Sequence, residues 1–190
     1  MTQESDLEIH FSRAYNEVAS KIVMKAKEDG IREAKRFLAI AIANSVLALL
    51  ERTSLEDRKL LIVPVPSTSL AKRRRGEDFI FELAKDVRKV LRPKFLENQI
   101  KIERLLGVNR QISDQTRLSE FERGQNLIGA FRVTEKLPEP IPIIVIDDVV
   151  TTGSTIREAF RALKERNLTV IGGATACASR RRLPIRYPSD

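Results

Sequence analysis

The feature that most constrains the fold is an unbroken apolar run, Ile143 to Ile146, which is followed at once by two aspartates. A continuous β-branched run is typical of a central strand that is buried on both faces of a parallel sheet. Beyond a short polar loop, apolar residues recur at helical spacing up to Leu163, and Thr169 to Ala176 is expected to be a second strand. Strand, helix and strand within about 35 residues form a βαβ unit. The sequence therefore predicts an α/β fold with a mainly parallel, twisted sheet flanked by helices.

The N-terminal segment has a helical pattern. Apolar residues from Leu7 to Lys27 recur at helical spacing, and Asp29-Gly30 supplies the glycine that commonly ends a helix. A second helix is expected from about Ile31 to Glu51, where the side chains are apolar nearly all round. We therefore expect residues 1–55 to form an N-terminal pair of helices, with His10 as a partly buried helix residue.

The middle of the chain alternates short apolar runs with polar loops. Lys59 to Pro66 is expected to be a buried strand that ends in a rigid turn, and Asp78 to Leu91 a helix. Residues 107–125 are polar and show few signals for either element. A polar loop of that length inside a compact domain is usually a lid, a binding loop or a disordered segment. Ala130 to Val133 is a candidate short strand.

Composition limits the chemistry that the chain can perform. Its 190 residues fit a single domain, residues 1–190. One cysteine and one histidine argue against an internal disulfide, a thiolate zinc site and histidine-based catalysis. Cys177 lies in an apolar run and is expected to be a small core residue. The net charge of +8 fits anionic partners as well as an ordinary solvated surface of mixed charge.

Neither membrane insertion nor export is expected. The longest apolar stretch, Phe37 to Leu50, is interrupted by Asn44 and Ser45 and is too short to span a bilayer. The N-terminal residues are polar and acidic, unlike a secretory signal. Since the chain has no disulfide to form and shows no export signal, the expected location is cytoplasmic, with no membrane partner.

The loop after the apolar run has the residue types of a phosphate site. Its residues are Thr151, Thr152, Gly153, Ser154 and Thr155. The glycine lets the backbone approach an anion closely, and the backbone N–H groups at the start of the following helix would donate to it. Asp147 and Asp148 would repel a phosphate, so they are better suited to accept hydrogen bonds from a sugar diol or to act through Mg²⁺. The spacing fits neither a Walker A loop nor a three-glycine Rossmann fingerprint.

A second candidate loop follows the strand that ends at Pro66. The carboxyl ends of parallel strands meet at the same edge of a sheet, and arginine offers forked, charge-assisted donors to a pyrophosphate. The candidate pyrophosphate-binding residues are Ser67, Arg73, Arg74 and Arg75. Taken alone, an arginine triplet is more often a solvated face, but its place after this strand favours the binding role.

The segment from Val145 to Thr155 resembles the phosphoribosyl pyrophosphate (PRPP) motif of the type I phosphoribosyltransferases: an apolar strand, two acidic residues, two apolar residues and a T-x-G-x-T loop. The resemblance implies a type I phosphoribosyltransferase fold with a flexible hood. It implies that Asp147 and Asp148 are the catalytic residues that bind the ribose 2′- and 3′-hydroxyls, and that residues 151–155 cradle the 5′-phosphate. It also implies Mg²⁺ as the cofactor, held through PRPP and by Asp147 or Asp148. Some purine-using relatives have an acidic residue at the Thr151 position, so Thr151 disfavours a 6-oxopurine acceptor.

Over most of its length the chain resembles the ComF-like (competence protein F) phosphoribosyltransferases. The matching segments are Pro64-Val65-Pro66, Arg74-Arg75-Gly76, Gln115 with Leu118, Arg123 with Asn126, Ala130-Phe131, and Val145 to Thr155. The resemblance implies a hood region at residues 105–133, in which the segment from Arg110 to Asn126 covers the site. Carried over by position, Gln115, Arg123 and Asn126 belong to the hood, and Arg110 and Arg117 could add contacts to pyrophosphate.

Two features depart from that family. Its members usually begin with a cysteine-rich zinc ribbon, which this sequence lacks, so partner contacts made through a ribbon are not expected. They also favour Phe-Asn-Gln after Arg-Arg-Gly, where this sequence has Glu77-Asp78-Phe79. Two added carboxylates beside a pyrophosphate loop could weaken that site or recruit Mg²⁺.

The sequence thus predicts an enzyme that transfers the phosphoribosyl group of PRPP to a small nitrogenous acceptor and releases pyrophosphate. The alternative is a non-catalytic protein that binds PRPP or serves DNA uptake, because basic residues cluster at 73–75 and in the tail, residues 180–190. Nucleic-acid contacts through these clusters would be weak and nonspecific. The interpretation also allows a homodimer.

Overall fold

A computed structural model describes residues 8–53, 59–67, 78–96, 99–109, 127–135 and 140–179. Among these residues, five strands form a fully parallel sheet in the order β1-β7-β6-β2-β3, and β4 and β5 form a separate antiparallel pair. The strands are β1 (Ile9–Ala14), β2 (Leu60–Pro64), β3 (Ile100–Ile102), β4 (Leu106–Val108), β5 (Phe131–Val133), β6 (Ile143–Val150) and β7 (Val170–Ala178). The helices are α1 (Glu17–Lys27), α2 (Arg32–Thr53), α4 (Phe79–Leu91), α6 (Ser154–Lys164) and a short 3-10 turn, η1 (Arg92–Lys94). The predicted α/β fold with a mainly parallel sheet flanked by helices is confirmed.

β6 is the central strand of the sheet and is buried along most of its length, as its β-branched sequence predicts. It pairs with β2 on one side and with β7 on the other. We expected the strand to end at Ile146, but it runs through both aspartates to Val150. The extension has a physical cause, because β7 stays paired with β6 as far as Val150 and Ala178. The two aspartates therefore lie on a hydrogen-bonded strand rather than in a loop.

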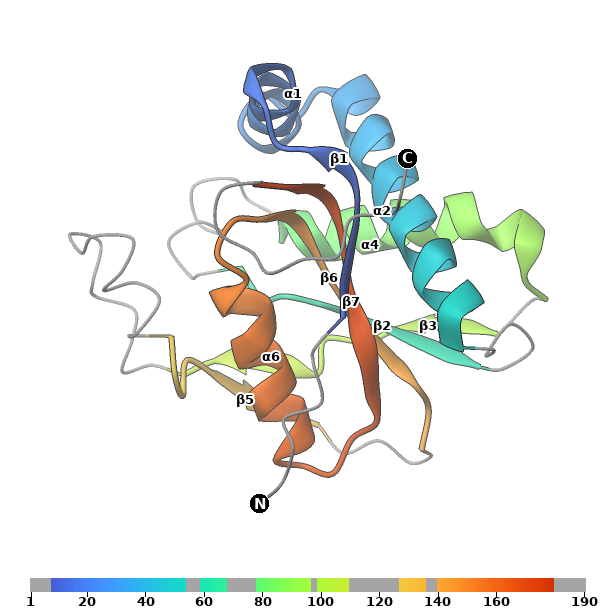
Figure 1. Cartoon of the computed structure of the whole chain (residues 1–190), viewed down its shortest axis with the longest axis vertical. Helices are drawn as coiled ribbons and strands as arrows, with labels where there is room; N and C mark the ends of the chain where they lie inside the picture. The colour runs from blue at the N-terminus through green and yellow to red at the C-terminus, as the bar shows by residue number, and fades with distance from the viewer. Residues whose placement is uncertain are drawn as a thin grey trace.

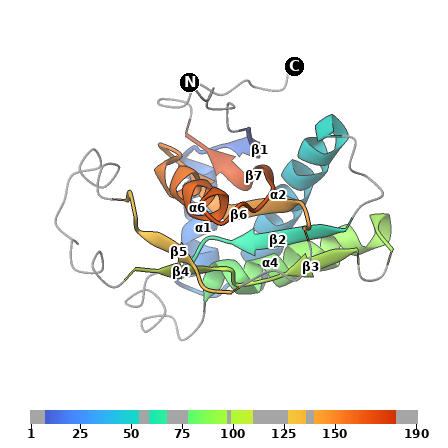
Figure 2. The same ribbon diagram turned by 90° about the horizontal axis from the view of Figure 1, so that it is seen from below.

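Helices cover both faces of the sheet (Figures 1 and 2). α2 and α4 pack on one face, with α1 against α2, and α6 packs on the other face with the β4–β5 pair. Side chains that alternate along β6 divide the core accordingly: Ile144 and Ile146 face the α2 side, and Ile143 and Val145 face the α6 side. In Figure 1, α1 lies at the top, beyond the carboxyl ends of β1 and β7. This position places α1 near the edge where the candidate loops begin.

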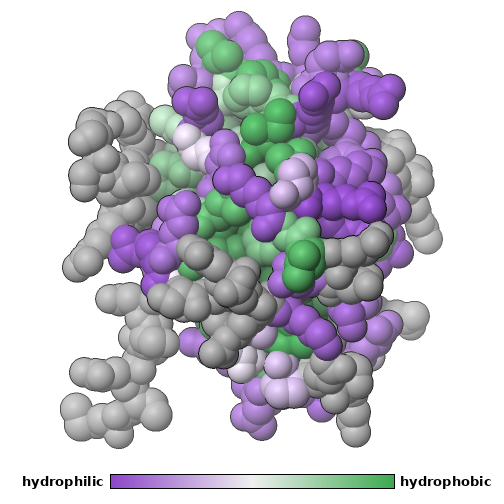
Figure 3. All heavy atoms as spheres, turned by 90° about the vertical axis from the view of Figure 1, so that its right-hand side faces the viewer, coloured by the Kyte–Doolittle hydropathy of each residue, from purple (hydrophilic) through white to green (hydrophobic). Residues whose placement is uncertain are grey.

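α2 confirms the expected second helix and lies close against β7. The approach depends on glycine, since a Cβ atom at Gly172 of β7 would stand 2.6 Å from Leu49 Cδ2 and 3.0 Å from the backbone oxygen of Glu8. On its outer side α2 exposes Phe37 and Ile40. Figure 3 shows that apolar patches are interrupted by hydrophilic side chains on the side of the molecule that lies to the right in Figure 1. Exposed apolar residues of this scattered kind are common on soluble proteins.

The N-terminal segment begins with a strand, so the prediction of one helix from Leu7 to Lys27 is wrong in its first part. β1 pairs in parallel with β7, and the helix starts only after Asn16, whose Oδ1 accepts a backbone N–H of the first turn at 2.9 Å. Ile9 and Phe11 pack into the core on the α6 side. Their spacing of two suits a strand, while the wider pattern also suits a helix. The segment forms a strand because it pairs with the edge of β7 that β6 leaves open. The residues of the segment itself do not reveal that this edge is available.

Buried hydroxyls fix β1 against its neighbours. Ser12 Oγ donates to a carbonyl of α2 at 2.6 Å and lies 3.0 Å from Ser45 Oγ, which donates to the carbonyl of Thr175 on β7 at 2.8 Å. His10, expected on a helix, is on this strand, and its Nε2 lies 3.0 Å from a carboxylate oxygen of Glu8. The pair of N-terminal helices is thus present as α1 and α2, with an edge strand before it.

The other predicted elements, β2, α4, β5, α6 and β7, are confirmed at their expected places. β3 was not predicted, because its three residues are too few to show a period of two. It pairs with β2 and forms the second edge of the sheet. None of the helices in the described ranges is both long and apolar enough to cross a membrane.

Candidate functional site

The carboxyl ends of β2 and β6 stand side by side at one edge of the sheet. The backbone N–H of Val65, just after β2, donates to the carbonyl of Ile146 at 3.0 Å. Ser67 follows two residues later, beside the strand that carries the two aspartates. Its hydroxyl donates to Asp78 Oδ1 at 2.9 Å, which ties the end of β2 to the start of α4. The expected meeting of the two loop origins at one edge is therefore present in the fold.

Several predicted residues lie outside the described part of the chain, and their roles stay predictions. They are Arg73, Arg74, Arg75 and Glu77 of the pyrophosphate loop, Arg110, Gln115, Arg117, Arg123 and Asn126 of the hood, and the basic tail at residues 180–190.

The turn from β6 into α6 is built around Gly153. Its φ of 76° lies in the left-handed region, which glycine adopts without strain. Because Gly153 is the N-cap residue, α6 begins without a capping side chain at that position. Thr152 Oγ1 and Ser154 Oγ lie 2.8 Å apart beside the first-turn N–H groups. Backbone N–H groups, the positive end of the helix dipole and two hydroxyls together make this helix start suited to an anion.

The two aspartates of β6 differ in their surroundings. Asp147 is half-buried, and its Oδ1 accepts the backbone N–H of Asp148 at 2.9 Å. Burial, and next the negative charge of Asp148, raise the pKa of Asp147 well above its usual 3.8. Asp148 is only 3% exposed, and its Oδ2 has no aligned hydrogen-bond donor among the described residues. That oxygen instead lies 2.6 Å from Nζ of Lys27, the last residue of α1.

One comparison with known protein families covers this edge of the sheet. Residues 94–187 match the family model described as Phosphoribosyl transferase domain, and the match includes β6, the turn at Gly153 and α6. The chain has the type I phosphoribosyltransferase fold. The narrower resemblance to ComF-like proteins remains a prediction.

Solved structures of phosphoribosyltransferases align with the chain at low sequence identity. A hypoxanthine phosphoribosyl transferase from Trypanosoma cruzi is 15% identical, with 100% of this chain and 78% of that chain covered and a TM-score of 0.42. A hypoxanthine-guanine phosphoribosyltransferase from Bacillus anthracis is 13% identical, with coverage of 82% and 76% and a TM-score of 0.44. A hypoxanthine phosphoribosyltransferase from Staphylococcus aureus is 13% identical, with coverage of 78% and 69% and a TM-score of 0.41. Among curated protein sequences, none matches the chain.

Two cationic side chains of this phosphoribosyltransferase fold contact the candidate site, although the sequence did not single them out. Arg157, in the first turn of α6, donates from Nη2 to the carbonyl of Thr152. It could have been found, because it lies two residues beyond the T-x-G-x-T loop on the helix that the motif predicts. Lys27 reaches Asp148 from the opposite end of the sequence. Only the packing of α1 over the strand ends reveals that contact.

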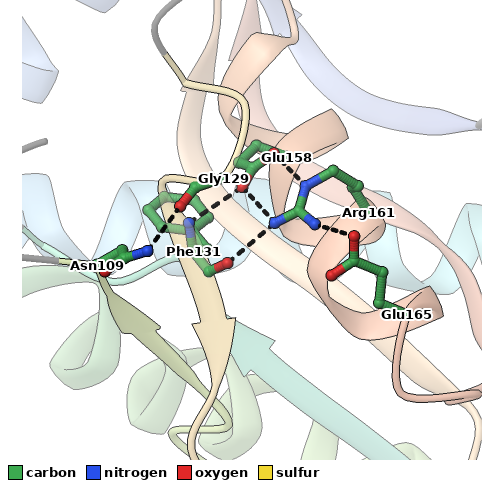
Figure 4. Close-up of polar contacts among 6 residues, drawn as sticks. All are labelled: Asn109, Gly129, Phe131, Glu158, Arg161 and Glu165. Carbon is green, nitrogen blue, oxygen red and sulfur yellow. Dashed lines mark hydrogen bonds and ion pairs between the residues drawn. The ribbon is translucent and has the colours of Figure 1, made fainter. Parts of the chain in front are cut away.

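Figure 4 shows polar contacts that join α6 to the β4–β5 pair. The buried carboxylate of Glu158 accepts the backbone N–H of Phe131 at 3.0 Å. Arg161 contacts both carboxylate oxygens of Glu158, at 2.7 and 2.8 Å, donates to the carbonyl of Phe131 at 3.0 Å, and forms an ion pair with Glu165. The helix that begins at the turn around Gly153 thus also contacts β5.

The described residues at the two ends of the predicted hood region, residues 105–133, are joined to each other. Val108 of β4 is paired with Phe131 of β5, and Nδ2 of Asn109 donates to the carbonyl of Gly129 at 3.3 Å (Figure 4). The chain therefore leaves and re-enters the described fold at one place, beside α6.

Cys177 is a buried core residue, as predicted. Burial, and next the charge of Asp148, raise the pKa of its thiol to about 11, so the thiol is protonated at neutral pH. Within the described ranges, no group of three or more His, Cys, Asp or Glu side chains could hold a metal ion.

Proposed function

We propose that this protein is a Mg²⁺-dependent phosphoribosyltransferase that binds PRPP and transfers its phosphoribosyl group to a nitrogenous acceptor. One observation carries the proposal. Two adjacent carboxylates near the end of β6 are followed, after the turn at Gly153, by the start of α6, inside the segment that matches a phosphoribosyl transferase domain. A ligand that carries hydroxyls and a phosphate a few ångströms apart fits this combination, and the phosphoribosyl group is such a ligand.

The parts of PRPP need opposite kinds of partner. Ribose hydroxyls donate hydrogen bonds, which the carboxylates of Asp147 and Asp148 accept, whereas the 5′-phosphate needs the donors at residues 151–155. The pyrophosphate would extend toward the end of β2, where Ser67 stands and where the loop with Arg73, Arg74 and Arg75 begins. The neighbouring ends of β2 and β6 support this assignment.

Mg²⁺ fits this edge as a partner of the substrate. Asp147 is half-buried at the strand end, while Oδ2 of Asp148 is engaged by Lys27. Mg²⁺ is commonly bound by one or two carboxylates together with substrate phosphates. Asp147 would therefore hold it with oxygens of PRPP. Its contribution when bound is positive charge beside the pyrophosphate oxygens.

The transfer is a substitution at C1′ of the ribose. A bond forms between the acceptor nitrogen and C1′ while the bond from C1′ to the pyrophosphate oxygen breaks, and pyrophosphate leaves with the electron pair. This chain's contribution is positioning, because the aspartates of β6 fix the ribose and the start of α6 fixes its 5′ end. Arginine and hydroxyl donors near Ser67 would stabilise the charge that develops on the leaving group.

The acceptor is a nitrogenous base or an amine. The position at which some purine-using relatives have an acidic residue is here Thr151, which is exposed at the turn after β6. A threonine hydroxyl does not exchange protons with a base at neutral pH, so proton transfer from the acceptor would need another group. A panel of bases and amines is therefore required, and it should include 6-oxopurines as the disfavoured class.

Calorimetry with PRPP and Mg²⁺ tests the binding step. Wild-type protein should bind PRPP, and Asp147→Asn and Asp148→Asn should each lose most of the binding heat. Asp86→Asn is the matched control, because it removes a carboxylate that pairs with Lys89 on the outside of α4. No heat with the wild type, or equal heat in all three variants, contradicts the binding assignment.

Pyrophosphate release with the acceptor panel tests the transfer step. Release that depends on an acceptor and is lost in Asp148→Asn establishes the enzyme. PRPP binding without turnover, together with DNA binding that falls steeply with salt, would instead support the non-catalytic or DNA-uptake role.

A further inference from the structure

We infer that Lys27 is a positioning residue of the PRPP site: it holds the buried carboxylate of Asp148 in place, so that Asp147 is the more exposed of the two carboxylates that meet the ribose. The inference rests on the proposed function, because it divides the work of the two aspartates in that site. It predicts that a residue of the N-terminal helix pair, outside the PRPP motif, governs PRPP affinity.

The ion pair between Lys27 and Asp148 is the first support. Nζ and Oδ2 lie 2.6 Å apart, and the side chain of Asp148 is 5% exposed while that of Lys27 is 29% exposed. Oδ2 has no aligned hydrogen-bond donor in the described residues, so the nearby ammonium group is what offsets its charge. A buried carboxylate in this situation depends strongly on its cationic partner.

The ammonium group is itself held by the fold. Lys27 is the last residue of α1, where the negative end of the helix dipole favours a cation. Its Nζ also lies 5.8 Å from the centre of the ring of Phe79, which is fully buried at the start of α4. Asp78, immediately before Phe79, accepts the hydroxyl of Ser67. Lys27 therefore stands between the end of β6 and the start of α4, close to the origins of both candidate loops.

The two aspartates are consequently unequal. Asp148 is buried and engaged by a cation, whereas Asp147 is half-buried and accepts the backbone N–H of Asp148 with one carboxylate oxygen. Lys27 also reduces the negative charge that the aspartate pair would present to a substrate with several phosphate groups. Loss of Lys27 should therefore weaken PRPP binding both by releasing the Asp148 side chain and by increasing repulsion.

Calorimetry with PRPP and Mg²⁺ on variants of α1 tests this role. Lys27→Met and Lys25→Met remove the same charge from the last turn of the same helix, and Lys25 is exposed. Lys27→Met should weaken PRPP binding about tenfold or more, and Lys25→Met by less than about twofold. Lys27→Arg keeps the positive charge and should retain most of the wild-type affinity for PRPP. Lys27→Gln, which keeps a polar side chain, is measured in parallel in case the methionine variant does not fold.

A double variant separates positioning from a general effect on folding. If Lys27 acts through Asp148, then Lys27→Met combined with Asp148→Asn should weaken PRPP binding little more than Asp148→Asn alone. Additive losses, or equal affinities of the wild type, Lys27→Met and Lys25→Met, overturn the inference and leave the proposed function standing. A wild-type protein that does not bind PRPP overturns the proposed function, and this inference with it.

Discussion

Glu158 of α6 accepts the backbone N–H of Phe131 of β5 at 3.0 Å, and Arg161 secures the same carboxylate from one turn further along the helix. The carboxylate of Glu158 is buried, while the Arg161 side chain is 31% exposed. The contact joins two segments that the sequence treats separately: the helix after the candidate phosphate turn and the strand after the predicted hood. α6 therefore links the candidate phosphate turn at Gly153 to β5.

Glu158→Ala should destabilise the protein, because it leaves the buried N–H of Phe131 without an acceptor and removes the main partner of Arg161. We expect a loss of about 2–3 kcal/mol, or a fall in melting temperature of roughly 5–10 °C for a chain of this size. Glu165→Ala is the matched control, since Glu165 pairs with the same arginine but its side chain is 64% exposed. It should change stability by less than about 0.5 kcal/mol. Equal melting temperatures for the two variants would contradict the expectation that the buried contacts of Glu158 stabilise the protein more than the exposed ion pair of Glu165.

Gly153→Ala should lower both stability and PRPP affinity, because it forces an alanine to a φ of 76° and adds a methyl group at the start of α6. The strain costs roughly 1–2 kcal/mol. Gly30→Ala, in the turn between α1 and α2, has a similar φ of 65°, and its Cβ would meet nothing within 4 Å. It should cause a similar fall in melting temperature with PRPP binding unchanged. If both variants bind PRPP as the wild type does, the turn at Gly153 is not the phosphate site.

Sequence patterns predicted the part of the fold in which local residue type determines the backbone. The β-branched run of β6, the glycine at 153 and the apolar spacing of α6 each specify an element without knowledge of the rest of the chain. β1 was mistaken for a helix, because its apolar positions suit both periods and only the free edge of β7 favours a strand. β3 is too short to show any period.

In the candidate site too, the sequence predicted the residues of the local motif but not the contacts that depend on tertiary packing. Asp147 and Asp148 were predicted as equivalent partners of the ribose, because the motif is local and gives no information on burial. Their different surroundings come from burial and from α1, which places Lys27 in an ion pair with Asp148. Contacts of this kind depend on how distant elements pack, and a single sequence does not contain them in readable form.

Cys177 should react slowly with thiol reagents in the folded protein, because burial keeps its thiol inaccessible and raises its pKa to about 11. At pH 8 about one molecule in a thousand would carry the thiolate, the form that reacts. Alkylation with iodoacetamide at pH 8 should therefore be at least about a hundredfold slower in the native protein than in urea. The signal is unambiguous, since the chain has one cysteine. Equal rates in native protein and urea would place Cys177 at an accessible position.

Asp147→Asn should raise stability while it removes PRPP binding. Burial and the charge of Asp148 raise the pKa of Asp147 above its usual 3.8, so the folded protein binds that proton more tightly than the unfolded chain does. The stability that protonation contributes is complete below about pH 3.8 and is lost as the pH rises through the folded-state pKa. As the pH rises above 3.8, the buried carboxyl of Asp147 therefore costs the folded protein stability. Asparagine removes that charge and keeps the oxygen that accepts the N–H of Asp148.

Asp148→Asn is the neighbouring control with the opposite expected sign. It makes the same chemical change one residue later, but it breaks the ion pair with Lys27 and should lower the melting temperature. Both variants and the wild type are melted in EDTA between pH 4 and pH 8, so that no metal contributes. The gain in Asp147→Asn should shrink toward pH 4, where the wild-type carboxyl becomes protonated, and the loss in Asp148→Asn should persist at pH 7. If both substitutions shift the melting temperature in the same direction at pH 7, the two aspartates are equivalent, and the unequal division between a held carboxylate and a ligand-facing one is wrong.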